Sequence, residues 1–428
     1  MQFSQIINQK KVKAQFVELV QQNRLSHALL LLGKEGNGAL ALALGLAQYI
    51  TCEKVNGPRS TDPSQQLSPS LFEDIVADSQ LPASDLLIDS CGNCPSCYKA
   101  QQLIHPDIHF SFPVVIKKSG SPPVSKDYII NWREFIKANP YGNVFEWLQY
   151  IGAENKQGNI TAQECSDIIS IMNLKSFESG YKILILWMPE YLGNEGNKLL
   201  KLMEEPPPDT LFILVTHNEN LILPTIVSRC QLIKIPALDA KDIEEALISL
   251  GNTDAATAKQ IAALCEGNYN EAIQLMTDAE NGPVVTLWQA MIRDWLNAIL
   301  KTGPLAQAKW VEEISGLGRE KQKQFLRYFN HLLGQAIRLR IAPSQPSPKG
   351  KESDSGIKSY SFVIAEAEKD FAERLNKIAG IEQQQAIIEE LDRATYYIER
   401  NAHAKILFHA LSIKIYHIIK DKIVFLVG

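Results

Sequence analysis

A glycine-rich loop is the most informative chemical feature of this chain. The apolar run Ala28–Leu32 is followed by Gly33 and, five residues later, by Gly38, which is the glycine spacing of the phosphate-binding motif G-x-x-x-x-G-K-[ST]. In a working loop a lysine and a hydroxyl residue come next and contact the phosphates and Mg²⁺. Here those two positions are Ala39 and Leu40. The pattern predicts a loop that keeps the shape of a nucleotide site without its cation and its metal ligand.

The retained glycines Gly33, Gly36 and Gly38 have two explanations. Backbone N–H groups of such a loop could still hold a small anion such as phosphate. Alternatively, the sharp turn from strand to helix needs backbone conformations that glycine adopts readily. We favour the second explanation, and we expect the isolated chain to bind ATP at best with millimolar affinity and not to hydrolyse it.

Four of the seven cysteines form a metal-ligand pattern. Cys91, Cys94 and Cys97 have the spacing C-x₂-C-x₂-C, and Cys52 offers a fourth thiol. Four thiolates form a closed tetrahedral zinc site that is structural and leaves no open position for catalysis. A redox-active thiol cluster is the alternative. The insertion Glu53–Ser90 separates Cys52 from the other three cysteines, although looping it out costs only loop-closure entropy.

That insertion, Glu53–Ser90, is acidic, with seven carboxylates against two basic residues. A solvated excursion from the fold is the favoured interpretation, and an acidic docking site is the alternative. The chain as a whole has a formal net charge of −5, which argues against a protein that grips nucleic acid through its overall field. We expect a cytoplasmic protein, because the sequence contains neither a long apolar membrane span nor a signal peptide pattern.

The elements that position these motifs alternate between strands and helices. Short apolar runs predict buried strands of a parallel sheet that helices cover on both faces. The strands are expected at Ala28–Leu32, Ile183–Trp187 and Leu211–Val215, with weaker candidates at Asp107–Val115 and Leu232–Ile235. Helices are expected at Ala39–Ile50, Ala162–Leu174 and Glu195–Glu205, the last of which the triple proline Pro206–Pro208 ends.

Composition shifts divide the chain into three predicted domains. Residues 1–236 form a doubly wound α/β domain, residues 237–281 a small helical domain, and residues 282–428 an all-helical domain. Within the third domain, Trp288, Trp295 and their neighbours at helical spacing predict an apolar stripe of the core. The segment Ala342–Lys358 is rich in Pro, Ser and charge, which predicts a flexible loop.

Three linked signals resemble the bacterial clamp-loader branch of the AAA+ family. They are Gly180–Trp187 with Asn197–Pro207, then Thr210–Thr216 with Leu223–Cys230, and finally the four cysteines with His105–Asp107. The resemblance covers residues 1–280 and continues faintly at Arg400–Lys405. It implies an AAA+-like sheet domain with a degenerate P-loop and a zinc knuckle, a helical lid, and a C-terminal collar through which the subunits of a hetero-oligomer associate.

The resemblance also locates the parts of a hydrolytic site. The family's acidic pair falls on Trp187 and Met188, and Glu190 lies two residues too late to replace it, unless the chain has shifted. The sensor arginine of the second domain falls on Asn270, whereas Thr216 occupies the position of the polar sensor. The groups that would meet a triphosphate and its magnesium ion are therefore missing from this chain.

Arg229, in the triplet Ser228-Arg229-Cys230, is the one charged family residue that remains. The resemblance implies an arginine finger, which reaches across a subunit boundary to the γ-phosphate that a neighbouring ATPase binds. The alternative is an arginine that pairs with a carboxylate on its own surface. His27 and His105 match family positions as well, and we interpret both as structural.

The function that the resemblance implies belongs to DNA replication. The chain would be a non-hydrolysing clamp-loader subunit of DNA polymerase III, without ATP of its own and with structural zinc. Its partners would be the tau/gamma ATPase subunits and the delta subunit, and it would act on the sliding clamp and primed DNA through the complex. An active tau/gamma-like ATPase and a zinc-containing nucleic-acid-binding module are the two rival interpretations.

Overall fold

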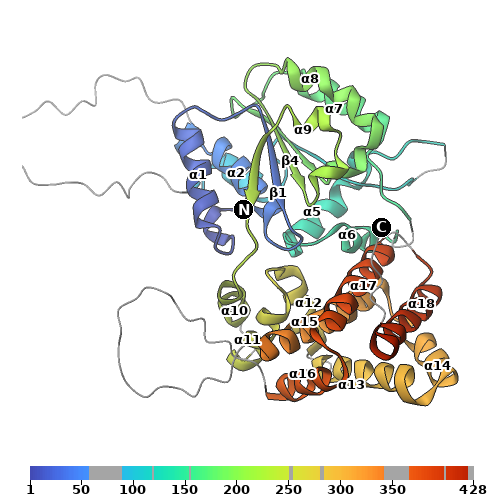
Figure 1. Ribbon diagram of the computed structural model, residues 1–428. Coiled ribbons are helices and arrows are strands. Elements are labelled where there is room, and N and C mark those ends of the chain that lie inside the picture. Colours follow the sequence, from blue (N-terminus) through green and yellow to red (C-terminus); the bar gives the residue numbers. More distant parts are fainter. Residues whose placement is uncertain are drawn as a thin grey trace, which may run out of the picture. The chain divides into compact units, whose positions relative to one another are not determined.

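The computed structural model describes residues 1–56, 89–117, 120–153, 156–249, 254–279, 284–341, 366–399 and 402–422. They belong to two compact units, Met1–Met276 and Thr277–Gly428 (Figure 1). The expected flexible loop Ala342–Lys358 and most of the acidic insertion Glu53–Ser90 lie outside the described residues. The expected lid, residues 237–281, lies almost wholly in the first unit, and the division into three domains remains a prediction.

The first unit contains, in its described part, a five-stranded sheet whose pairings are all parallel. The strand order is β2-β3-β4-β1-β5. The bounds are β1 Ala28–Gly33, β2 Ile108–Ser111, β3 Lys182–Trp187, β4 Thr210–Thr216 and β5 Gln231–Ile235. All five predicted strands are therefore confirmed, and the weak candidate Asp107–Val115 is shorter than expected, since only Val114 continues it, in an isolated bridge with Asn159.

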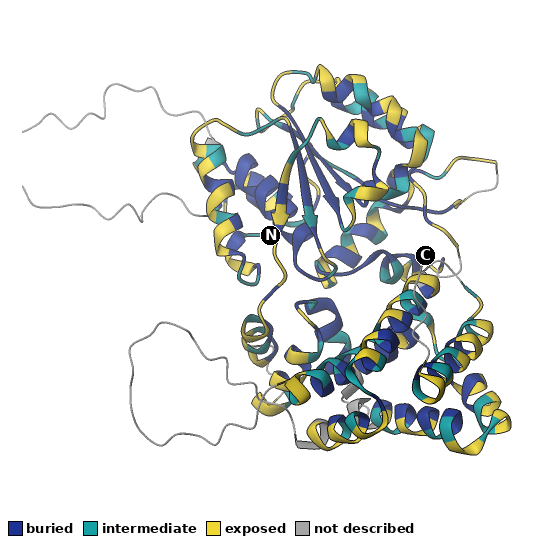
Figure 2. Ribbon diagram, viewed as in Figure 1, coloured by how far each residue is buried: buried dark blue, intermediate teal, exposed yellow. Residues whose placement is uncertain are grey.

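Helices cover both faces of this sheet, so alternate residues of its central strands are buried on opposite sides. Leu30, Leu186 and Leu214 pack with α7, the 3-10 helix η4 and α9 in one core. On the other face lies α2, whose residues are all buried (Figure 2). The relevant bounds are α2 Ala39–Thr51, α7 Ala162–Met172, η4 Pro189–Leu199, α8 Leu200–Glu204 and α9 Pro224–Val227.

The remaining described helices of the first unit surround this framework. They are η1 Phe3–Gln5, α1 Lys10–Gln21, α3 Glu53–Asn56, α4 Pro95–Gln101, η3 Ser125–Tyr128, α5 Ile129–Ala138, α6 Val144–Tyr150, η5 Glu219–Leu221, α10 Ala240–Ser249 and α11 Ala255–Leu264. Helix α12, Tyr269–Ala279, runs across the boundary between the two units.

The expected helix Glu195–Glu205 is wrong in its first half. Residues up to Leu199 belong to the 3-10 helix η4, and α-helical hydrogen bonding begins only at Leu200. Two glycines weaken helix formation there. Gly193 leaves helical geometry, with φ 50° and ψ −139°. Gly196 lets α9 approach closely, because a Cβ at this position would lie 2.8 Å from Cδ1 of Ile226.

The second unit is helical throughout its described residues. Its elements are α13 Val284–Asn297, η6 Ala298–Thr302, α14 Pro304–Ser315, α15 Arg319–Ile341, α16 Glu366–Ile378, α17 Ile381–Glu399, α18 Ala404–Tyr416 and η7 His417–Asp421. Its centre is the stacked pair Trp295 and Trp310, with ring centroids 4.5 Å apart. The predicted apolar stripe is thus core, as Trp288 and Trp295 are both buried. No helix within the described ranges has the length and hydropathy that a bilayer span requires.

Candidate functional site

The glycine loop follows β1 at the edge of the sheet where the parallel strands have their carboxyl ends, which is where doubly wound folds bind ligands. Gly36 and Gly38 have φ angles of +71° and +89°, which only glycine adopts without strain. These conformations support the explanation that the turn itself requires the glycines. Both residues, and the alanine that replaces the lysine, Ala39, are buried.

Side chains of the same unit occupy the surroundings of this loop. The ring of Tyr141 lies against Gly38, since a Cβ there would be 2.8 Å from its Cε1 atom. Tyr269 donates its backbone N–H to the Gly36 carbonyl at 3.1 Å, and its ring meets that of Tyr141 edge-on. The buried amide of Asn37 accepts from the Ala39 N–H at 3.1 Å and donates to the Ile235 carbonyl at 2.9 Å. Protein groups therefore bond to and cover part of the glycine loop.

The positions of the family's acidic pair are apolar and buried. The Trp187 ring packs against Trp132, with centroids 5.0 Å apart, and Met188 adopts a left-handed backbone conformation. Glu190, two residues later, bonds to the turn after β4, which supports a structural role for it. One oxygen, Oε1, accepts hydrogen bonds from the Thr216 hydroxyl and from the backbone N–H of His217 at 2.9 Å. The hydroxyl of Thr216, at the expected position of the polar sensor, is thus hydrogen-bonded to Glu190.

Asn270, at the position of the sensor arginine, is buried in a polar cluster around Glu146. Its Nδ2 donates to Glu146 Oε2 at 2.8 Å, and its Oδ1 accepts from Asn139 at 2.7 Å. Glu146 also accepts from the Asn143 N–H at 3.0 Å and from the Gln274 side chain at 2.5 Å. These contacts join α12 to α6 and to the end of α5. Asn270 thus joins α12 to the sheet domain through direct side-chain hydrogen bonds.

Sequence reasoning missed this cluster, although a signal for it exists. Asn143 and Glu146 form a capping box at the start of α6, and the pattern Asn-x-x-Glu before an apolar run is typical of one. The same Glu146 carboxylate then receives the amide of Asn270, which lies 124 residues further along the chain. Spacing along the sequence gives no indication of that second contact.

We expect Glu146→Ala to loosen α12 from the sheet domain. The substitution leaves the buried Nδ2 of Asn270 without its acceptor, at a cost of about 1–3 kcal/mol. Amide hydrogen exchange of Tyr269–Met276 should therefore accelerate by roughly 10- to 100-fold. The control is Glu134→Ala, which removes an exposed carboxylate of α5 that accepts from Tyr150 at the surface. Equal exchange rates in the two variants would contradict this role of Glu146.

Arg229 lies in the turn between α9 and β5, at the amino end of β5. This is the edge of the sheet opposite the glycine loop, because Gly33 pairs with Ile235 at the far end of the same strand. Four strand steps, roughly 13 Å, separate Gln231 from Ile235. The guanidinium of Arg229 is paired with Glu204, and Nε lies 2.9 Å from Oε1. The surface carboxylate of the alternative interpretation therefore exists, in a pair whose side chains are 30% and 48% exposed.

The four cysteines of the predicted zinc site lie together. Sγ atoms of Cys52, Cys91, Cys94 and Cys97 all lie within 4.8 Å of one another. The Sγ atoms of Cys91 and Cys97 are 3.9 Å apart, close to the roughly 3.8 Å that tetrahedral Zn–S bonds of about 2.3 Å require. Cys52 joins the cluster although the insertion separates it in sequence, so the donor set fits a structural zinc ion.

The surroundings of the cluster are also those of a metal knuckle. The backbone N–H of Cys91 donates to Cys52 Sγ at 3.3 Å, and that of Cys97 to Cys94 Sγ at 3.4 Å. Burial raises the pKa of Cys52 and Cys97, and a nearby cation would favour their thiolate forms. Burial opposes ionisation of Cys91 too, but neighbouring N–H groups and thiols lower its pKa to about 7.

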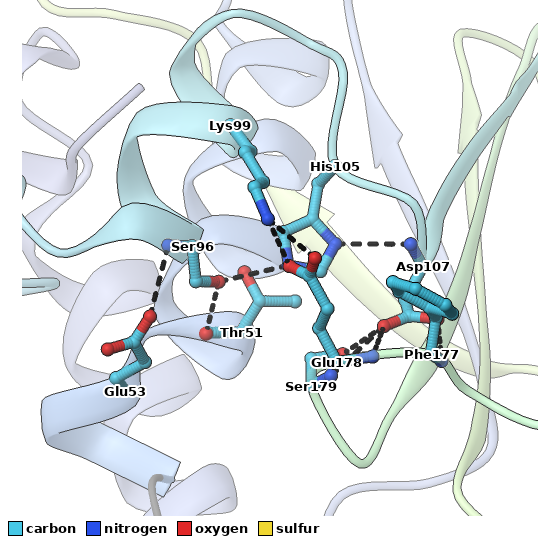
Figure 3. A network of polar contacts seen from close by, with 9 residues as sticks. All are labelled: Thr51, Glu53, Ser96, Lys99, His105, Asp107, Phe177, Glu178 and Ser179. Atoms are coloured by element: carbon cyan, nitrogen blue, oxygen red, sulfur yellow. Dashed lines mark hydrogen bonds and ion pairs between the residues drawn. The ribbon is translucent and has the colours of Figure 1, made fainter.

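A hydrogen-bond network connects this cluster to the sheet (Figure 3). Ser96, between two of the cysteines, donates to the Thr51 carbonyl at 2.6 Å and contacts His105 Nε2 at 3.0 Å. His105 Nδ1 accepts from the Asp107 N–H at 3.1 Å. Burial lowers the pKa of His105, which favours a neutral ring that donates from Nε2. The structural interpretation of His105 is therefore confirmed, whereas the side chain of His27 is exposed.

Asp107 extends the network to the segment before β3. Its carboxylate accepts from the backbone N–H groups of Phe177 at 2.5 Å, Glu178 at 2.7 Å and Ser179 at 3.0 Å. Burial alone would raise the pKa of Asp107, but these donors outweigh it and lower the pKa. Glu178 in turn pairs with Lys99 of α4 at 2.5 Å (Figure 3). The cysteine cluster is thus fixed to the amino ends of the strands.

The fold and the site define a class: an α/β protein with a parallel sheet, in which the loop after β1 has the glycine spacing of a phosphate-binding motif and Ala39 and Leu40 stand at its lysine and hydroxyl positions. The profile of the family described as "DNA polymerase III, delta subunit" matches residues 8–77 and 64–239. Together these ranges make up more than half of the 428 residues. The chain belongs to this family, and the predicted resemblance to the clamp-loader branch is confirmed.

Individual relatives agree with this assignment. The DNA polymerase III subunit delta' of Bacillus subtilis is 25% identical over 272 residues, which are 64% of this chain and 60% of that protein. The subunit delta' of Pseudomonas aeruginosa is 28% identical over 162 residues, which are 36% of this chain and 48% of that protein. The chain therefore spans between about half and three fifths of the length of these two relatives.

Two further similarities are to proteins described as gamma or gamma/tau subunits. The DNA polymerase III subunit gamma/tau of Mycoplasma pneumoniae is 23% identical over 287 residues, 65% of this chain and 31% of that protein. A solved structure of a DNA polymerase III gamma subunit-related protein from Thermotoga maritima is 13% identical and has a TM-score of 0.36. The match covers 94% of this chain and 98% of the Thermotoga maritima chain.

Proposed function

We propose that this chain is the non-hydrolysing, delta-prime-type subunit of a bacterial clamp loader and that it presents Arg229 to the ATP of a neighbouring ATPase subunit. In the complex it would help to place the sliding clamp on primed DNA, with tau/gamma and delta subunits as neighbours. The loss of the lysine at Ala39 distinguishes it from a tau/gamma-like ATPase, despite the similarity to such proteins. The fold would be that of an AAA+ protein with a lid and a collar.

The observation that carries the proposal is the position of Arg229 relative to the glycine loop. The two lie at opposite edges of one parallel sheet, so the arginine cannot reach a phosphate in its own loop. A charged group at that edge can serve a nucleotide only if the nucleotide is bound to another chain that lies against this edge. Arginine suits this task, because its planar guanidinium is permanently charged and matches phosphate oxygens.

A further candidate function, nucleic-acid binding through the zinc knuckle, has less support. The cysteine cluster is tied by Ser96 and His105 to the sheet, which supports a structural role for it. The net charge of −5 also opposes a protein that binds DNA through its overall field. Binding of DNA by the isolated chain with a steep salt dependence would support this candidate instead.

We expect the isolated chain to bind Mg-ATP no more tightly than millimolar and to show no ATP turnover. The loop lacks the lysine and the magnesium ligand, and the ring of Tyr141 packs against Gly38. Titration calorimetry measures the affinity, and a phosphate-release assay measures the turnover. Micromolar binding would contradict this expectation and would favour the ATPase interpretation.

A further inference from the structure

We propose that Glu204 is a positioning residue for Arg229: it holds the guanidinium from one side and leaves the other donors available to a phosphate of the neighbouring chain. This inference rests on the proposed function, since it concerns the same arginine. It adds a second residue to the finger, one whose side chain touches Arg229 and not the nucleotide.

The contacts of the guanidinium carry this inference. Nε donates to Glu204 Oε1 at 2.9 Å, and Nη2 donates to the same oxygen. Nη1 donates to the Thr225 carbonyl at 2.6 Å and makes a long contact of 3.4 Å with Ser228 Oγ. An arginine has five N–H donors, and three of them are engaged closely here. Two donors remain for an acceptor outside the chain, one N–H on Nη1 and one on Nη2. Of these, only that on Nη1 makes the long contact with Ser228 Oγ.

The backbone frame keeps Glu204 and Arg229 in register. Glu204 is the last residue of α8, which the prolines from Pro206 onward prevent from continuing. Arg229 follows α9, whose Ile226 is 1% exposed in the core. Ile226 reaches that core because Gly196 has no side chain, as described above for η4. Glu204 ends α8 and Arg229 lies in the turn after α9, and both helices pack on η4. Side chains on such fixed backbone lose less freedom when they pair than side chains on mobile loops do.

Helix electrostatics also indicate a partner role for Glu204. A carboxylate at the carboxyl end of a helix is disfavoured by the local dipole, so Glu204 contributes nothing favourable to α8 itself. The positive charge of Arg229 compensates this unfavourable interaction of the Glu204 carboxylate. In water such an exposed pair contributes only about 0–1 kcal/mol, so it does not lock the arginine away. When a second chain excludes water from this edge, the same pair strengthens.

The test is the ATPase turnover of the assembled complex, built from this chain and the tau/gamma and delta subunits of its own organism. Glu204→Gln keeps the size and one oxygen acceptor but removes the charge, and Glu204→Ala removes both. We expect kcat to fall by about 10-fold for the glutamine variant and by up to about 10²-fold for the alanine variant. KM for ATP should change much less, because the arginine acts chiefly on the transition state.

Glu205→Gln is the matched control. Glu205 is the next residue and is exposed, and within the described residues the carboxylate that pairs with Arg229 is that of Glu204. Glu205→Gln changes the net charge by the same amount as Glu204→Gln. A double variant, Glu204→Ala with Arg229→Ala, should be no slower than Arg229→Ala alone, since a positioning residue has no effect once its arginine is gone. Size-exclusion chromatography verifies that each variant assembles.

Three results would overturn the inference. Equal turnover of Glu204→Gln and Glu205→Gln, with Arg229→Ala inactive, removes the role of Glu204 and leaves the proposed function intact. Faster turnover of Glu204→Gln identifies Glu204 as a competitor of the phosphate. If Arg229→Ala itself turns over like the unmodified complex, the proposed function fails and the inference fails with it.

Discussion

Replacing Arg229 by alanine should reduce the clamp- and DNA-stimulated ATPase rate of the assembled complex by about 10³- to 10⁵-fold at the site that this chain faces, the range typical of arginine fingers. The guanidinium of an arginine finger neutralises charge that develops on the transferred phosphoryl group. The measurement is steady-state turnover with the sliding clamp and primed DNA present. Where other ATP sites in the complex remain active, single-turnover phosphate release isolates the affected site.

Two controls separate this effect from a loss of structure. Arg229→Lys keeps the positive charge but not the planar fork, so we expect it to recover only a small part of the rate. Assembly of the Arg229→Ala complex should be unchanged, because the exposed pair with Glu204 contributes little stability. Normal turnover of an intact complex containing Arg229→Ala would make Arg229 an ordinary surface arginine and leave this chain a scaffold.

Removal of the proposed zinc ion should unfold the cysteine module. The freshly purified, reduced chain is expected to contain about one zinc per molecule, and Cys97→Ala to contain almost none. Structural zinc contributes apparent binding free energies of about 10–16 kcal/mol in small peptides. The packing of the seven-residue helix α4 cannot replace that. Elemental analysis measures the metal, and amide hydrogen exchange should show that α4 has lost its protection.

Cys165→Ala is the control for this prediction, because Cys165 is a buried cysteine of the α7 core that lies outside the cluster. It should retain the zinc and the protection of α4. Reduced protein that contains no zinc when freshly purified would contradict the metal assignment. So would a Cys97→Ala variant in which α4 is as well protected as in the control.

The sheet could be predicted from the sequence, because each of its strands leaves a local signal. Runs such as Leu211–Val215 are apolar on both faces, which is typical of parallel strands between two helical layers. The cysteine cluster was also predictable, since three of its members lie within seven residues. The membership of Cys52 in this cluster has no such local signal. Only the folded chain brings its sulfur to the others across the insertion.

The less predictable part of the site depends on contacts between distant residues. The sequence identifies Asn270 as the place of a missing arginine, but not Glu146 as its partner. Likewise, Arg229 could be recognised by its triplet, while Glu204 stands 25 residues earlier in a motif with two adjacent glutamates. Which of these two faces the arginine is decided by the turn of α8 and by the packing of α9 on η4. Those are tertiary effects that no local pattern encodes.

The packing around the glycine loop has a consequence for how this chain could change over evolutionary time. Restoring a lysine at Ala39 and a threonine at Leu40 would return the motif but not the site. Tyr141 fills the space beside Gly38, Tyr269 holds the Gly36 carbonyl, and apolar Trp187 stands where an acid is needed. No single one of these changes would give activity, because all of these positions would have to change together. Under the proposed function, the absence of hydrolysis would therefore be hard to reverse, and selection would act on this chain through what it offers to its neighbours.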